Sequence, residues 1–69
     1  MTFKELEAAT CRDSVELVTN MPMNLWHYLI GEFSNRCEEL ERLGFLERGE
    51  TLSGMQWPIW RKVKDIEAD

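Results

Sequence analysis

One stretch near the middle of the chain limits the fold more than any other. Cys37, Leu40 and Leu43 are spaced three residues apart, which places apolar side chains on one face of a helix. Gly44 follows the last of them, at the position where a helix C-terminus often requires a left-handed residue. Phe45 then begins an extended segment. The sequence therefore predicts a helix that ends at a glycine and continues at once into a β-strand.

A second extended segment, residues 56–63, follows the first after a polar stretch. The intervening residues 51–55 (Thr-Leu-Ser-Gly-Met) suit a turn between two strands. Pro58 has no amide hydrogen, so it must lie at an outer edge of a sheet or at a bulge. We expect Trp60 to point toward the core. Together the two segments predict a C-terminal two-stranded β-hairpin.

The N-terminal residues predict two short helices. Thr2 and Glu5 have the spacing of a capping box, which indicates a helix over about residues 2–10. Asp13 also has a glutamate three residues after it and predicts the start of a second helix. That helix should end near Asn20, because the residue before a proline is driven out of helical geometry.

The segment between these helices and the hairpin allows two interpretations. Asn24 can cap a helix, and apolar residues at intervals of three and four continue from Trp26 onward. This pattern suits either one helix over residues 25–43 or two helices divided near Gly31. A glycine costs a helix only about 1 kcal/mol relative to alanine, which does not decide the matter. We favour the division, with Ser34 as the N-cap of the second helix.

Length and charge limit what the chain can do. With 69 residues it forms one domain, and 43% hydrophobic residues are enough to build a core. The net charge of −5 opposes nucleic-acid binding, which depends on clustered lysine and arginine. Most of the basic residues nevertheless lie within residues 35–64. We expect residues 1–64 to form the domain and the acidic residues 65–69 to be a disordered tail.

Several classes of protein are excluded by the residues present. Cys11 and Cys37 have no CxxC spacing, and with a single histidine, His27, they make no credible metal site. His27 has no partner at the spacing of a catalytic triad, and no glycine-rich phosphate loop exists. We therefore expect neither enzyme activity nor a cofactor. Without an apolar leader or membrane-spanning run, a cytoplasmic protein with reduced thiols and no membrane contact is expected.

Four short segments in the C-terminal half form a series found together in one class of protein. They are Ser34-Asn35-Arg36, Glu39-Leu40-Glu41-Arg42-Leu43-Gly44-Phe45-Leu46, Gly49-Glu50 and Ile59-Trp60-Arg61. In this series the chain resembles small phage and prophage winged helix-turn-helix proteins. The match covers residues 33–63, less than half of the chain. The resemblance implies an α+β, winged-helix-like domain with N-terminal helices and a C-terminal two-stranded hairpin.

The first hypothesis for function is a non-enzymatic DNA-binding regulator of phage or mobile-element type. The helix after residue 33 would read double-stranded DNA and the hairpin would contact its backbone. The candidate residues are Ser34, Asn35, Arg36 and Arg42 on the helix, and Arg48, Arg61 and Lys62 on the hairpin. This hypothesis requires the basic side chains to converge on one surface.

The alternative is an acidic protein-binding module that inhibits or adapts a host nucleic-acid-processing protein. Its carboxylates would stand in for phosphates, and an exposed aromatic residue would anchor the contact. The candidate residues are Glu38, Glu39, Glu41 and Trp57. This hypothesis requires an exposed apolar patch bordered by carboxylates. A homodimer is a further option, because a chain this short gains buried surface by pairing.

Overall fold

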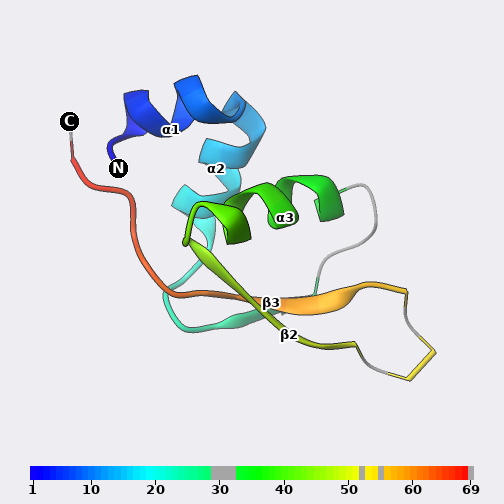
Figure 1. The fold of residues 1–69 in the computed structure, drawn as a ribbon. Coiled ribbons are helices and arrows are strands. Elements are labelled where there is room, and N and C mark those ends of the chain that lie inside the picture. The colour runs from blue at the N-terminus through cyan, green and yellow to red at the C-terminus, as the bar shows by residue number, and fades with distance from the viewer. Residues whose placement is uncertain (29–32, 52, 55, 69) are drawn as a thin grey trace.

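The computed structural model describes the whole chain except residues 29–32, 52, 55 and 69. Within the described residues the fold is α+β, with three helices and a three-stranded antiparallel sheet, compatible with the expected winged-helix-like domain (Figure 1). The elements are, in chain order, α1 (Phe3–Ala9), α2 (Arg12–Asn20), β1 (Trp26–Tyr28), α3 (Ser34–Arg42), β2 (Leu46–Thr51) and β3 (Pro58–Lys62). No helix in the described part of the chain is long and apolar enough to cross a membrane.

The first helix follows its sequence signals, and the second departs from them at one end. Thr2 caps α1, and its hydroxyl accepts a hydrogen bond of 3.3 Å from the Glu5 amide, as predicted. The predicted start of α2 at Asp13 is wrong, because the helix begins at Arg12. The Cys11 backbone is extended, and its carbonyl accepts the first amides of the helix. Because Cys11 holds the N-cap position, Asp13 is the second residue of the helix and does not cap it.

A strand, β1, occupies part of the segment that was expected to be helical. The backbone of Asn24 takes the left-handed conformation, with φ of 60°, and its amide donates to the Lys62 carbonyl at 2.9 Å. This contact sets the chain beside β3, where Trp26 pairs with Arg61. The backbone N–H and C=O groups on the free edge of β3 need hydrogen-bond partners. A helix over residues 26–28 could not supply them, because its own backbone groups would be paired within the helix. Tertiary pairing therefore overrides the helical pattern of the apolar residues.

Helix α3 begins as a separate helix, as we favoured, although its first turn differs from the prediction. Phe33 holds the N-cap position with a helical backbone, so Ser34 is the first helical residue and not the cap. Gly31 lies outside the described residues. At the other end, Gly44 has φ of 87°, which confirms that the helix stops at a left-handed glycine before β2 begins.

The predicted hairpin is present, but the sheet contains a third strand. The strand order is β1-β3-β2, so β3 lies in the centre. Arg48 of β2 pairs with Trp60 of β3, and the register is irregular between Arg48 and Thr51. Pro58 is the first residue of β3 and stands opposite Thr51, beside the irregular part of the β2–β3 pairing, where the missing amide hydrogen of a proline is tolerated.

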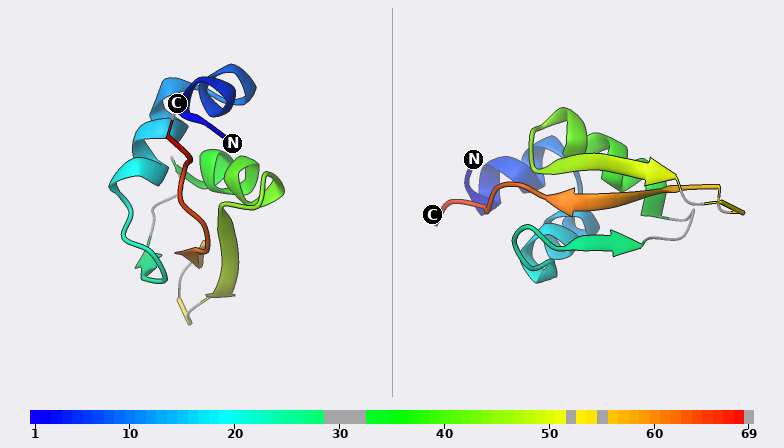
Figure 2. Two further views of the ribbon diagram at one scale, coloured as in Figure 1. Left: turned by 90° about the vertical axis from the view of Figure 1, so that its left-hand side faces the viewer. Right: turned by 90° about the horizontal axis from the view of Figure 1, so that it is seen from below.

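All three helices lie on one side of the sheet, and the other side is open. Figure 2, seen from below, shows the strands with the helices behind them and nothing in front. Side chains alternate accordingly: Leu46, Trp60 and Lys62 are buried toward the helices, whereas Glu47 is exposed. The buried apolar side chains form one core, made of Leu6, Val15, Val18, Met21, Cys37, Leu40, Phe45, Leu46 and Trp60.

The Lys62 ammonium group lies inside the molecule, not on the wing, so the prediction that it contacts DNA is wrong. Only 3% of the residue is exposed. Its Nζ donates to the carbonyl oxygens of Val18 at 2.7 Å and Met21 at 2.9 Å, and it pairs with Asp65 at 2.5 Å. These carbonyls lie at the C-terminal end of α2, where they lack partners within the helix and attract a cation.

Residues 65–68, which the sequence predicts to be part of a disordered acidic tail, contact the N-terminal residues and the core in the structure. The Glu67 amide donates to the Met1 carbonyl at 3.0 Å, and the terminal amine of Met1 lies 3.3 Å from the Glu67 carboxylate. Ile66 packs against the core. The acidic residues are thus used to hold the C-terminal segment beside α1, starting from the Lys62–Asp65 pair.

We expect Lys62→Met to destabilise the protein by about 2–4 kcal/mol. The change keeps the apolar stem but leaves two buried carbonyls without their donor. Urea unfolding monitored by tryptophan fluorescence measures the loss. Lys64→Met is the matched control, because Lys64 is exposed and its Nζ lies over the Phe45 ring, 4.7 Å from the ring centre. An equal, small loss in both variants would contradict the structural role of Lys62.

Candidate interaction surface on the open sheet face

The helix-free side of the sheet, here called the open sheet face, carries Trp26, Glu47, Gly49, Ile59 and Arg61. The register places Trp26, Arg61 and Glu47 in one row across β1, β3 and β2. A Cβ built on Gly49 would lie 2.0 Å from Cζ3 of Trp26. The indole therefore extends from β1 across β3 and rests directly on the backbone of β2.

A hollow lies beside the Trp26 ring. It has a volume of about 620 Å³ and is lined by Trp26, Ile59 and Gly49, with Arg48 and Glu50 from β2 at its margin. Trp26 is 47% exposed despite its contact with Gly49. This arrangement is an exposed apolar patch with a carboxylate beside it, which is the feature that the protein-binding hypothesis requires.

The residues just before β1 enlarge the apolar surface. Leu25 is 50% exposed and Met23 is 43% exposed, and both precede Trp26 in the chain. Large apolar side chains scattered singly on a surface are ordinary, but here three occur within four residues. This run and the hollow make the β1 side of the sheet the most apolar exposed region among the described residues.

The indole of Trp26 is held by an arginine and a glutamate. The Arg61 guanidinium carbon lies 5.3 Å from the centre of a Trp26 ring, within the range of a cation–π contact. The same guanidinium forms an ion pair with Glu47 on the neighbouring strand. Arg61 therefore supports the aromatic wall of the hollow and already has a carboxylate partner, which weakens its predicted role as a phosphate ligand.

Two of the other arginines proposed for DNA, Arg36 and Arg48, are also matched with carboxylates. Arg36 lies 2.9 Å from Asp13 on α2. Arg48 lies 3.3 Å from Glu41 and 3.8 Å from Glu38, both on α3, and its guanidinium stacks over the Trp60 ring at 4.7 Å. The arginines thus turn toward separate acidic partners. With Lys62 buried, the structure does not gather the predicted basic residues into one surface.

The remaining candidates lie on or near α3. Asn35 and Arg42 are exposed, and Ser34 opens the helix. Glu38 and Glu41 of the protein-binding hypothesis are engaged with Arg48. These two carboxylates are consequently neutralised in part and do not form a free acidic face.

Only part of the open sheet face is predicted by the sequence. Trp57 and Glu39 are half-buried and do not line the hollow. Trp26, Gly49 and Glu50 were not proposed as site residues, because Trp26 was assigned to a helix. A tryptophan facing a glycine across a sheet is a recurrent way to cover a bare backbone, but it is recognisable only once the strand pairing is known.

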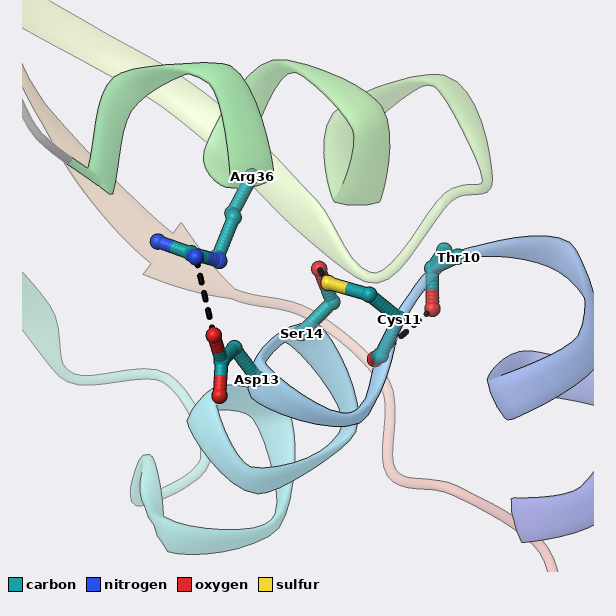
Figure 3. Close-up of polar contacts among 5 residues, drawn as sticks. All are labelled: Thr10, Cys11, Asp13, Ser14 and Arg36. Carbon is teal, nitrogen blue, oxygen red and sulfur yellow. Dashed lines mark hydrogen bonds and ion pairs between the residues drawn. The ribbon is translucent and has the colours of Figure 1, made fainter.

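A second cluster surrounds Cys11 at the start of α2 (Figure 3). The Cys11 Sγ lies 3.3 Å from the Ser14 Oγ, and Arg36 reaches over from α3 to Asp13. Hydrogen bonds from the Ser14 hydroxyl and amide lower the pKa of the Cys11 thiol, and Arg36 adds to the effect. By contrast, burial raises the pKa of Cys37 to about 12. The described residues include no group of three or more side chains suited to hold a metal ion.

The chain matches no protein-family model, no curated protein and no solved structure.

We expect Cys11 to be alkylated by iodoacetamide near neutral pH while Cys37 stays unmodified until the protein unfolds. A lowered pKa gives more thiolate at a given pH, so the rate for Cys11 should rise with pH through a midpoint below that of a free cysteine peptide. Peptide mapping by mass spectrometry separates the two sites. Ser14→Ala should move the midpoint upward, and an unchanged midpoint would show that Ser14 does not tune the thiol.

We expect Gly49→Ala to destabilise the protein by about 1–3 kcal/mol, because the new methyl group overlaps the Trp26 ring and approaches the Ile59 carbonyl oxygen at 2.8 Å. Chemical denaturation gives the loss. In a Trp26→Ala background the cost should fall, since the indole is then absent. An equal cost in both backgrounds would place the whole effect on the Ile59 carbonyl.

Proposed function

We propose that this chain is a non-enzymatic protein-binding domain that docks on a partner through the open sheet face. The observation that carries the proposal is the half-exposed Trp26 indole, held over Gly49 beside an apolar hollow. Tryptophan is the residue most often found as an anchor of protein interfaces, because it buries a large rigid surface. Among the residues that the structure describes, no nucleophile or histidine lines the hollow, which supports binding over catalysis.

The charge distribution favours a protein partner over DNA. Duplex binding gains its free energy from basic groups that neutralise phosphates. Here Arg36, Arg48 and Arg61 would first have to leave carboxylate partners, and the chain as a whole carries a net charge of −5. The DNA-binding hypothesis therefore remains a prediction with less support than the protein-binding one.

The position of α3 in the chain points the same way. In a helix-turn-helix motif the recognition helix follows another helix after a turn of three or four residues. Here the strand β1 lies between α2 and α3. This arrangement favours a role for α3 in packing on the sheet over a role as a recognition helix in the major groove of DNA.

We expect Trp26→Ala to abolish capture of a specific partner from a lysate of the source cells, whereas Phe3→Ala leaves it intact. Phe3 is the matched control, because it is an aromatic residue of similar exposure (38%) that lies on α1, away from the open sheet face. Affinity purification with quantitative mass spectrometry measures the enrichment. Equal capture by both variants would count against the open sheet face as the docking surface.

Fluorescence anisotropy with a pool of mixed duplex DNA tests the competing function. We expect no binding even at low salt. Micromolar binding that weakens steeply with added salt, and that Arg42→Ala or Arg48→Ala reduces, would favour DNA instead.

A further inference from the structure

We infer that the hollow on the open sheet face binds a basic, extended segment of a partner protein, with an arginine or lysine side chain seated between Trp26 and Glu50. This inference rests on the proposed function, because it names the chemistry of the partner that the open sheet face would bind.

The walls of the hollow suit the stem of a long basic side chain. Trp26 and Ile59 provide apolar surface, and Gly49 leaves the floor without a side chain. Arginine and lysine carry long aliphatic stems that pack on such surfaces while the charged head reaches a polar group at the margin. The volume of about 620 Å³ lies within the usual range for ligand pockets and admits the neighbouring part of an extended chain as well.

The charges at the margin select a cation. Among the described residues, the ionisable ones that line the hollow are Arg48 and Glu50. Arg48 is already matched by Glu41 at 3.3 Å. Glu50 is exposed, and its carboxylate forms no hydrogen bond or ion pair with another described residue. The carboxylate of Glu50 is therefore the charge left to be complemented, and the net charge of −5 attracts a basic partner from a distance.

The ring of Trp26 also favours a cation. Tryptophan is the best aromatic partner for guanidinium and ammonium groups. The Arg61 guanidinium, 5.3 Å from the ring centre, shows that this indole accepts a guanidinium within the fold itself. An arginine of the partner would gain the same stacking together with an ion pair to Glu50.

Other occupants fit less well. A phosphate backbone would meet the carboxylates of Glu47 and Glu50 on this side of the sheet. A second copy of the chain could offer the exposed Arg42 or Lys64, but it carries the same net charge of −5, so the two copies repel each other. A partner segment that brings its own unpaired basic residues avoids both costs.

The test uses the full chain labelled with ¹⁵N and a short end-blocked peptide of alternating arginine and alanine. We expect the peptide to shift the indole N–H signal of Trp26 and the backbone amides of Gly49 and Glu50. The Glu50→Gln variant should weaken binding about fivefold, the range of an exposed ion pair. Glu7→Gln is the matched control, because Glu7 is an exposed glutamate on α1 and its loss should leave the affinity unchanged.

A peptide in which citrulline replaces arginine separates charge from shape, since citrulline is nearly isosteric and uncharged. Equal binding of the citrulline peptide, an unchanged affinity in Glu50→Gln, or shifts confined to another surface would each overturn the inference. Shifts of the same amides by a duplex oligonucleotide or by increasing protein concentration alone would overturn it in favour of DNA or self-association.

The outcomes also distinguish this inference from the proposed function. If Trp26→Ala abolishes capture of a cellular partner but Glu50→Gln does not reduce it, the open sheet face is a docking surface for a partner of different chemistry. If neither variant changes capture and the arginine peptide does not bind, both proposals fail.

Discussion

The fold depends most on a single buried ammonium group. Lys62, at the end of the central strand, donates to two carbonyls at the end of α2 and pairs with Asp65. One side chain thus joins the sheet, the N-terminal helices and the C-terminal segment, which are distant in sequence. In a domain with so small a core, a polar contact of this kind fixes the relative position of layers that apolar packing alone would specify poorly. The ordered run of residues 65–68 beside α1 follows from it.

Several of the acidic residues pair with basic residues of the same chain, and this changes the surface that a partner meets. Asp13, Glu41 and Glu47 each hold an arginine that would otherwise face solvent or an anionic ligand. Surface pairs of this kind add little stability. Their effect is on the surface potential, because they remove the strongest positive centres and leave apolar area and spare carboxylates to define what binds.

Local signals and long-range contacts account for what the sequence did and did not predict. The Thr2 cap, the stop at Gly44 and the burial of Trp60 are set by neighbouring residues or by alternation, and each is confirmed. The strand β1, by contrast, forms because β3 offers it an edge, a fact outside any local window. The sequence alone predicts Lys62 at the surface, and it is buried because α2 packs against it. The hollow likewise depends on the contact between Trp26 and Gly49 across the sheet.

The packing of Trp26 on Gly49 couples the pairing of the edge strand β1 to binding at the open sheet face. Within the described residues, strand β1 spans Trp26–Tyr28, and the Trp26 indole crosses to the far strand. A molecule that stacks on the Trp26 ring also holds β1 against β3. Its binding free energy therefore stabilises the pairing of β1 with β3. Positions 26 and 49 are consequently coupled by sterics: a large side chain at one requires a small residue at the other.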